Sequence, residues 1–313
     1  MNQPLPRRTA FLLFAVVVVS WGLNWAVTKT IVHSVVPLWA TAIRSAIATA
    51  TLFALQLARG QFIIPRRGDL PVIIAIALLH MVAFSALVAF GLRFAPVGRS
   101  IVLGYTTPLW VVPGAWLFLK EPMTKSRLAG TALGVLGLIA MFNPLAFDWS
   151  DRDALTGSGL ILLAAFCWAA NILYVRAHRW VSTPFQLVFW QTLLASVVLA
   201  ALALLLDGAP QIAWTSSLTA AFLYSAIFGT ALAYWAMAVV NRSLPAVTTS
   251  LGILATPVIG VASSTLALGE PVDISLIVAM SMILGGIAVG TIPARSGPAH
   301  PRSRELAATT VRS

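Results

Sequence analysis

The sequence predicts an all-α integral membrane protein of ten transmembrane helices, arranged as two inverted five-helix repeats with both termini in the cytoplasm. Three observations support this prediction: an apolar composition, recurrent apolar runs of membrane-spanning length, and an internal repeat. Hydrophobic residues make up 59% of the chain and charged residues only 9%, against roughly 25% charged in an average soluble domain. Most of the protein surface is therefore expected to contact something other than water.

Apolar segments of about 20 residues recur along the chain, which is the length that a helix needs to cross a hydrocarbon core of about 30 Å. The expected helices cover residues 11–31, 37–58, 71–92, 97–118, 125–143, 158–177, 185–206, 217–239, 247–267 and 274–292. The first segment follows Arg7 and Arg8, as in a signal peptide, but no small-residue cleavage site closes it. We therefore expect it to be retained as the first helix.

The placement of positive charge predicts how the chain is oriented. With a cytoplasmic amino terminus, Lys29, Arg93, Arg99 and Arg152 lie outside, Arg44 lies within a helix, and the other 15 of the 20 cations are cytoplasmic. This distribution is the positive-inside bias of membrane proteins, and it predicts a multi-pass protein of the cell inner membrane, in contact with lipid. Because topology accounts for the net charge of +11, we expect no nucleic-acid partner.

The second half of the chain repeats features of the first half. At a spacing of 147 residues the matches are Trp21 with Trp168, Asn24 with Asn171, Pro37 with Pro184, and Arg44 with Gln191. At a spacing of 149 residues they are Pro96 with Pro245, Pro108 with Pro257, Glu121 with Glu270, and Pro122 with Pro271. Because each repeat has an odd number of helices, five, the two repeats must begin on opposite sides of the membrane. Such inverted repeats are a recurrent design of secondary transporters.

This repeat sets the expected domain boundaries. They are a cytoplasmic tail at 1–10, a first repeat at 11–143, an external linker at 144–157, a second repeat at 158–292, and a disordered cytoplasmic tail at 293–313. The tail is rich in Arg, Ser, Pro and Ala, a composition that does not support a packed core.

These motifs resemble the drug/metabolite transporter superfamily in its EamA-type branch. The shared features are W-x-x-N in the first and sixth helices, a central proline in the fourth and ninth, and an EP dipeptide after those two. Within the branch, the sequence is similar to bacterial aromatic amino acid exporters. The resemblance covers about residues 10–292 and implies a basket-shaped bundle with a central cavity that exports small metabolites, most specifically aromatic or other neutral amino acids.

Aromatic and polar side chains gather near the middle of the expected helices, about 12 to 17 Å from each helix start at 1.5 Å per residue. On the first helix, Trp21, Asn24, Trp25 and Thr28 follow i, i+3, i+4, i+7 spacing and share one face. Rings and a few donors on such faces suit a small-molecule pocket. The expected substrate-binding residues are Trp21, Asn24, Trp25, His80, Phe84, Tyr105, Trp168, Asn171, Phe228 and Thr256.

Each of these residues has an alternative, structural role. A tryptophan at mid-depth also packs well against neighbouring helices, and a lone histidine such as His80 is often a packing residue. Asn24 and Asn171 can form interhelical hydrogen bonds worth roughly 0.6 to 2 kcal/mol. Both roles stay open for these residues on the sequence alone.

Arg44 is the one cation expected inside the membrane, where an unpaired guanidinium costs roughly 3 kcal/mol or more. None of the nine Asp and Glu residues falls within an expected helix core. Arg44 must therefore reach outward to water, bind backbone carbonyls, or meet an anionic group of a substrate. The structural roles are favoured, although carboxylate binding would suit an amino acid substrate.

The missing carboxylates also bear on mechanism, because many proton-driven transporters carry protons on a membrane-embedded Asp or Glu. His80 is the only titratable group expected at mid-depth, and it permits that role without requiring it. A facilitator working by alternating access is therefore favoured. A multidrug or other metabolite exporter coupled to protons is the alternative, although a site for cationic drugs would want an acidic residue.

Prolines and glycines indicate where helices bend or approach closely. Pro108 and Pro257 are expected mid-helix, where they are structural or gating elements. Small-xxx-small pairs in the fifth and tenth helices allow close contact with a neighbouring helix or with a second protomer, so a homodimer is an open alternative. These pairs are Gly130 with Gly134 and Gly286 with Gly290.

Other function classes find little support. No HExxH, GxSxG or P-loop motif occurs, and the loops are too short for a soluble catalytic domain, so we expect no enzyme, no catalytic residues, no metal and no cofactor. A non-transporting receptor or scaffold is the remaining alternative from another class. A flux assay separates it from a transporter.

Overall fold

The computed structural model describes residues 5–142, 148–244, 248–249 and 252–291, and helices dominate this part of the chain, with no strand. Seven of the described helices are long and apolar enough to cross a membrane. They are Arg7–Ser34, Pro37–Ala58, Arg67–Phe94, Val97–Leu119, Arg152–Ala177, Pro184–Leu206 and Ser216–Asn241. The expected all-α class is confirmed, and these apolar helices agree with a membrane protein.

The remaining expected segments contain shorter helices. They are α7 (Lys125–Met141), α13 (Ala255–Leu268) and α14 (Ile274–Gly290). Part of the expected ninth segment and all of the expected tail at 293–313 lie outside the described residues.

Four of the long spans are continuous helices or nearly so, and three contain a break. The continuous spans are α1 (Arg7–Ser34), α2 (Pro37–Ala58), α8 (Arg152–Ala177) and α9 (Pro184–Leu206). The first broken span consists of η1 (Arg67–Asp69), α3 (Leu70–Ala75), η2 (Ile76–Phe84) and α4 (Ser85–Phe94), and the second of α5 (Val97–Gly104) and α6 (Thr107–Leu119). The third broken span consists of α10 (Ser216–Leu223), η3 (Tyr224–Leu232) and α11 (Ala233–Ser243). α5 and α6 are separated by Tyr105 and Thr106, and each of the other two broken spans includes a π-helix, η2 or η3.

The π-helices are nine residues long and lie in spans that the sequence repeat relates to each other. Within η3, the Thr230 hydroxyl donates to the carbonyl of Ser225, five residues earlier, at 2.9 Å. π-Helical turns are rare and often occur at functional sites, because they change the angle at which side chains leave the helix. Both π-helices contribute residues to the cavity described below.

The two prolines expected mid-helix lie instead in the first turn of a helix. Pro108 is in the first turn of α6 and Pro257 in the first turn of α13. A proline is tolerated there because its missing N–H would have no partner in the helix. The Thr107 hydroxyl donates at 2.8 Å to the carbonyl of Gly104, which a continuous helix would pair with residue 108. These prolines therefore begin helices after a break, and neither lines the cavity.

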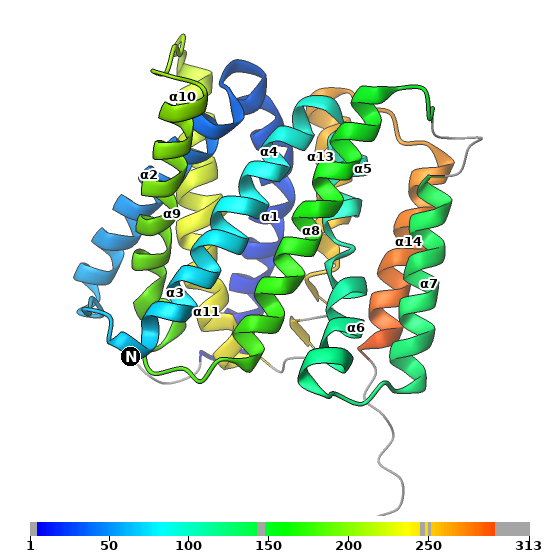
Figure 1. The fold of residues 1–313 in the computed structure, drawn as a ribbon, viewed down its shortest axis with the longest axis horizontal. Coiled ribbons are helices and arrows are strands. Elements are labelled where there is room, and N and C mark those ends of the chain that lie inside the picture. The colour runs from blue at the N-terminus through cyan, green and yellow to red at the C-terminus, as the bar shows by residue number, and fades with distance from the viewer. Residues whose placement is uncertain (1–4, 143–147, 245–247, 250–251, 292–313) are drawn as a thin grey trace, which may run out of the picture.

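Helices from the two halves of the chain pack in pairs (Figure 1). α2 lies against α9, α1 against α13, α8 against α4, and α7 against α14. The α2–α9 contact includes polar groups, because the Ser196 hydroxyl oxygen lies 3.1 Å from that of Thr49 and 2.9 Å from that of Ser45. α7 and α14 stand together at one side of the bundle in Figure 1.

Glycines explain how closely α7 and α14 approach. A Cβ atom added at Gly286 would lie 2.5 Å from the carbonyl oxygen of Gly130 and 2.8 Å from the amide nitrogen of Gly134. The small faces predicted from the sequence therefore meet each other within one chain. A homodimer stays a prediction, and these glycines do not provide its interface because they are covered.

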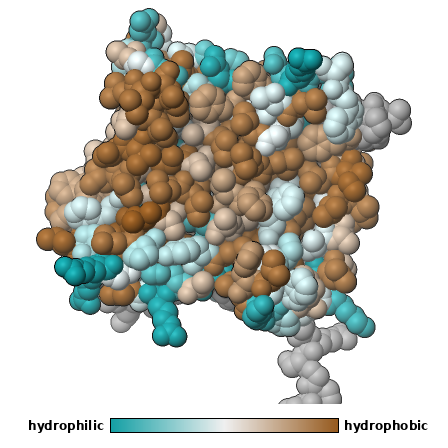
Figure 2. All heavy atoms as spheres, in the orientation of Figure 1, coloured by the Kyte–Doolittle hydropathy of each residue, from teal (hydrophilic) through white to brown (hydrophobic). Residues whose placement is uncertain are grey.

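The outer surface is apolar around the middle of the molecule. Figure 2 shows a broad brown region across the helices, with hydrophilic residues gathered at the two ends. Side chains such as Leu12, Phe118, Leu205 and Ile274 are more than two-thirds exposed. A lipid bilayer would cover this region, because its hydrocarbon core lies between two polar boundaries.

A carboxylate ties the loop before α14 to the start of α5. Glu270 accepts hydrogen bonds from the backbone N–H groups of Val97 and Gly98, at 2.8 and 3.0 Å. Nearby, the Lys29 ammonium donates to the Ala95 carbonyl at 2.9 Å. These N–H groups have no partner within the helix, so Glu270 caps α5 and compensates the positive end of its dipole.

Replacing Glu270 by alanine is expected to lower the free energy of unfolding by about 1 to 2 kcal/mol, because two helix N–H groups lose a charged acceptor. Glu270→Gln keeps one acceptor oxygen and should cost about half as much. Thermal unfolding of the purified protein measures both effects. Asp207→Ala is the control, since Asp207 is an exposed carboxylate at the end of α9 whose side chain makes no hydrogen bond with the described residues. An equal loss in the control would contradict the capping role.

Candidate functional site

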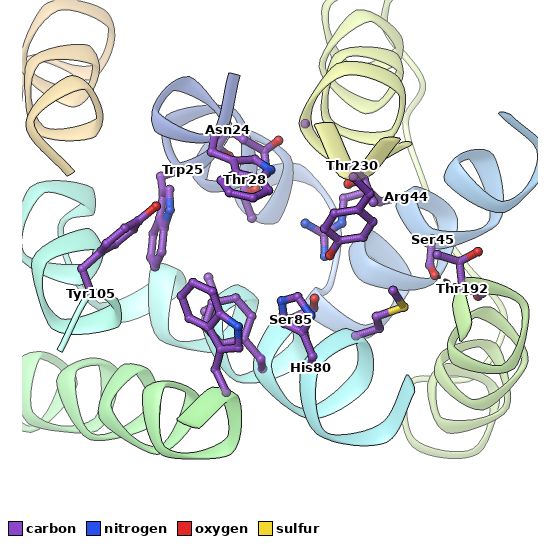
Figure 3. Close-up of a pocket in the computed structure, with 17 residues that line it drawn as sticks. Asn24, Trp25, Thr28, Arg44, Ser45, His80, Ser85, Tyr105, Thr192 and Thr230 are labelled. Carbon is purple, nitrogen blue, oxygen red and sulfur yellow. Dashed lines mark hydrogen bonds between the residues drawn. The ribbon is translucent and has the colours of Figure 1, made fainter. Parts of the chain in front are cut away.

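A cavity of about 150 Å³ lies among the helices, and it is the candidate substrate site (Figure 3). Its lining comes from both halves of the chain. The first half contributes residues of α1, α2, η2 and α4, and the second half contributes residues of α8, α9, η3 and α11. The lining residues are Trp21, Asn24, Trp25, Thr28, Arg44, Ser45, His80, Met81, Phe84, Ser85, Val88, Tyr105, Trp168, Thr192, Gly229, Thr230 and Tyr234. No single helix could form such a site.

Aromatic rings form one wall of the cavity, with Trp168 of α8 at its centre. The His80 and Trp168 rings are stacked, with centroids 5.6 Å apart and planes inclined by 4°. The Trp168 ring also lies 5.2 Å from that of Phe84 and 6.3 Å, edge to face, from that of Tyr105. These separations lie in the range of favourable ring contacts, so the wall is preorganised to accept a further flat ring.

The other end of the cavity is polar. We call the residues Arg44, Ser45, Thr192 and Thr230 the polar end, and Trp25 with Tyr105 the aromatic end. Figure 3 shows these two groups at opposite sides of the close-up, with His80 between them. The cavity therefore offers ring contact at one end and a cation at the other.

The first helix presents the face that its sequence predicts. Trp21, Asn24, Trp25 and Thr28 all line the cavity. Helical periodicity explains this, because residues three, four and seven apart project from the same side of an α-helix. The Thr28 hydroxyl donates to the Asn24 carbonyl at 2.7 Å within the helix. Their role in substrate binding stays a prediction.

Seven of the ten expected substrate-binding residues line the cavity, and three do not. The three outside are Asn171, Phe228 and Thr256, and a role of these three in substrate binding stays a prediction. Phe228 is 50% exposed and its ring stacks on that of Tyr224, with centroids 6.0 Å apart. Asn171 is buried elsewhere in α8, and Thr256 is fully buried in the first turn of α13. Depth along a helix indicates height in the membrane, but it does not give the direction of the side chain.

Arg44 lines the cavity, although its structural roles were favoured from the sequence. It lies close enough to Tyr234 and His80 to interact with them electrostatically. Within the described part of the chain it makes no hydrogen bond to a backbone carbonyl and no ion pair. The structure therefore does not supply the partners that a structural role requires.

Several lining residues were not predicted. They are Ser45, Met81, Ser85, Val88, Thr192, Gly229, Thr230 and Tyr234. Tyr234 had a usable signal, because it is one of only four tyrosines and lies well inside an expected helix. Gly229 lies against Asn24, since a Cβ atom there would be 2.7 Å from the amide carbon of Asn24. The small and aliphatic residues carry no sequence signal that distinguishes them from packing residues.

The described residues contain no group of three or more His, Cys, Asp or Glu side chains that could hold a metal ion. Cys167 has no disulfide partner, in agreement with its being the only cysteine. Within these residues, the polar groups of the cavity can bind a small molecule by hydrogen bonding and charge. They offer no metal-ligand cluster.

Comparison with known proteins identifies the family. A model of the EamA-like transporter family matches residues 8–143 and 155–291, which is most of the chain. The chain belongs to the EamA-like transporter family. As a member of this family, it is a multi-pass membrane transporter, and this points away from an enzyme.

Named relatives of this EamA-family chain are also transporters. It is 24% identical to the uncharacterised transporter YoaV of Bacillus subtilis, over 87% of this chain and 92% of YoaV. It is 28% identical to a protein of Salmonella typhimurium named as a probable amino-acid metabolite efflux pump, over 90% of this chain and 94% of that one. A protein of Escherichia coli with the same name is 26% identical, over 85% and 89%.

A solved crystal structure shares the fold of this EamA-family chain. The TM-score is 0.64 at 21% sequence identity, and the match covers 93% of this chain and 100% of the other. At this identity the likeness concerns the arrangement of the helices alone.

Proposed function

We propose that this protein exports aromatic or other neutral amino acids and related small metabolites across the cell inner membrane. The observation that carries the proposal is the cavity itself, which joins an aromatic wall around Trp168 to a polar end with Arg44. A ring binds by contact area at the wall, while a polar head group binds at the other end. The names of the Salmonella and Escherichia relatives agree with export of amino-acid metabolites.

The transporter works by alternating access between two inverted five-helix repeats, with ten spans and both termini in the cytoplasm. Several observations support this arrangement. The family model matches two separate segments of similar length, and a nine-residue π-helix occurs in each half. The contact between Thr49 and Ser196 joins residues 147 positions apart, which is the spacing of the sequence repeat.

The transport is facilitative, so substrate moves down its own gradient. Every acid that the structure describes lies in a loop or at a helix end, and none lines the cavity. His80 is the one imidazole in the cavity lining, and its ring is stacked on that of Trp168 and tilted against that of Tyr234. Transport into proteoliposomes with and without an imposed pH gradient tests this mechanism, and accumulation above the external concentration driven by that gradient would favour the proton-coupled alternative.

Efflux of a panel of radiolabelled amino acids from proteoliposomes tests the function. We expect wild-type vesicles to lose phenylalanine, tyrosine or tryptophan faster than empty vesicles, and to retain lysine and glutamate. His80→Ala and Trp21→Ala should slow this efflux, since each removes part of the cavity lining. Efflux equal to that of empty vesicles for the whole panel would reject amino-acid export and favour a multidrug exporter, or a receptor or scaffold.

A further inference from the structure

The guanidinium of Arg44 is an unused donor in the cavity. It carries five N–H groups, and among the described residues none of them has a hydrogen-bond or ion-pair partner. A charged donor group in a helical bundle is normally paired, because burial without a partner is costly. This charge is therefore open to a ligand that enters the cavity.

No carboxylate of the described chain competes for Arg44. The eight described acids lie in loops or at helix ends, at Asp69, Glu121, Asp148, Asp151, Asp153, Asp207, Glu270 and Asp273. Several already have partners: Glu121 pairs with Arg127 and Arg176 at 3.0 and 2.7 Å, and Asp69 binds Ser182. Only Glu305 falls outside the described residues. The cavity is therefore lined by a cation and by no anion.

The other polar side chains of the polar end add no charge to the cavity. The hydroxyls of Ser45, Thr192 and Thr230 each donate to a backbone carbonyl, at 2.9 to 3.4 Å, so their protons are already engaged. The cavity also contains one buried neutral acceptor without a partner, the side-chain oxygen of Asn24. An incoming carboxylate meets a free cation, whereas an incoming ammonium meets only neutral acceptors.

We propose that Arg44 binds the carboxylate of the substrate and that an α-ammonium group contributes little to recognition. The substrates are then carboxylates that also carry an aromatic ring. Aromatic amino acids are one kind, and arylalkyl carboxylates without an amine are another. This inference rests on the proposed transport function, because it assigns the head group that the same cavity selects. Guanidinium is well suited to this role, since its planar fork binds both oxygens of a carboxylate.

Three probes with the same ring separate the contributions of the two charges. L-Phenylalanine carries both charges, 3-phenylpropionate only the carboxylate, and phenethylamine only the ammonium. Each is added as a competitor to the exchange of labelled phenylalanine by the protein in proteoliposomes at neutral pH, with empty vesicles as the leak control. We expect 3-phenylpropionate to compete about as well as phenylalanine, and phenethylamine about tenfold or more worse.

Variants at Arg44 then assign the effect to that residue. Arg44→Gln should weaken competition by 3-phenylpropionate about 10- to 100-fold, as expected when a hydrogen-bonded charge is lost. Arg44→Lys should retain part of it, because the charge remains without the planar fork. Arg93→Gln is the matched control, since Arg93 is exposed and outside the cavity.

The outcomes distinguish this inference from the proposed function. Equal competition by phenethylamine and 3-phenylpropionate, or an unchanged profile in folded Arg44→Gln, would overturn the inference while amino-acid transport stood. If the wild-type protein exchanges no phenylalanine, transport of phenylalanine is rejected, and ligand-induced thermal stabilisation by the same three probes still tests the binding claim. Stabilisation by 3-phenylpropionate that Arg44→Gln abolishes would support it, and equal stabilisation by phenethylamine would reject it.

Discussion

Replacing Trp168 by alanine is expected to reduce export of an aromatic solute by about 10- to 100-fold. This residue is the centre of the aromatic wall, in contact with the rings of His80, Phe84 and Tyr105 at 5.6, 5.2 and 6.3 Å. Removing it eliminates ring contact worth about 1.5 to 3 kcal/mol with a bound substrate, and it frees the neighbouring rings to change orientation. Initial efflux rates from proteoliposomes measure the loss.

Two further variants separate a lost pocket from a damaged fold. Trp168→Phe keeps an aromatic ring in the wall and should retain a substantial part of the activity. Trp116→Ala removes a tryptophan that is 54% exposed and outside the cavity, and should leave transport unchanged. If folded Trp168→Ala exports as fast as wild type, the ring wall is a packing feature and the candidate cavity is wrong.

Replacing Gly286 by alanine should destabilise the protein by about 1 to 3 kcal/mol, through overpacking of α7 against α14. The new methyl group would lie 2.5 Å from the carbonyl oxygen of Gly130 and 2.8 Å from the amide nitrogen of Gly134. Both are backbone atoms, so no side-chain rotation relieves the clash and the two helices must separate. Thermal or detergent-induced unfolding of the purified protein measures the effect.

Gly290→Ala is the matched control for this prediction. It makes the same change one helical turn further along α14, where a Cβ atom would meet nothing within 4 Å. We expect it to unfold as wild type does. Equal destabilisation by the two variants would attribute the loss to a general intolerance of substitution in α14, and would contradict the specific contact with Gly130.

The first helix illustrates what can be predicted from the residues. Because side-chain directions within a regular α-helix follow from spacing alone, Trp21, Asn24, Trp25 and Thr28 were expected on one face, and all four line the cavity. No neighbouring helix has to be known for that inference. The all-α class follows in the same way, since it depends on composition and on segment length.

Phe228 shows where this reasoning stops. Its expected depth along the helix resembles that of His80, yet it is half exposed and does not line the cavity. Counting residues gives a height, whereas the rotation of a helix about its axis depends on the helices that pack around it. In this span the π-helix η3 changes the angular step as well, so regular periodicity could not have oriented the side chain.

For Arg44, one part of the interpretation follows from the sequence and another part only from the packing of the helices. The sequence alone shows a cation inside an apolar segment and no carboxylate at the same depth, which identifies a group that needs a partner. Its position beside Tyr234 and His80 brings together three helical spans, and the span of Tyr234 lies in the other half of the chain. Only the packing of those spans decides that the guanidinium meets a cavity rather than a backbone carbonyl.

The sequence by itself determined the all-helical membrane class, the resemblance to a transporter family, and one face of the first helix. These depend on properties that lie along the chain: hydropathy, segment length and helical spacing. The tertiary structure alone decided which of the mid-depth residues share a cavity, that Asn171, Phe228 and Thr256 do not, and that Pro108 and Pro257 begin helices. The physical reason is that a cavity is the space between helices, and its lining depends on how each helix is rotated against its neighbours.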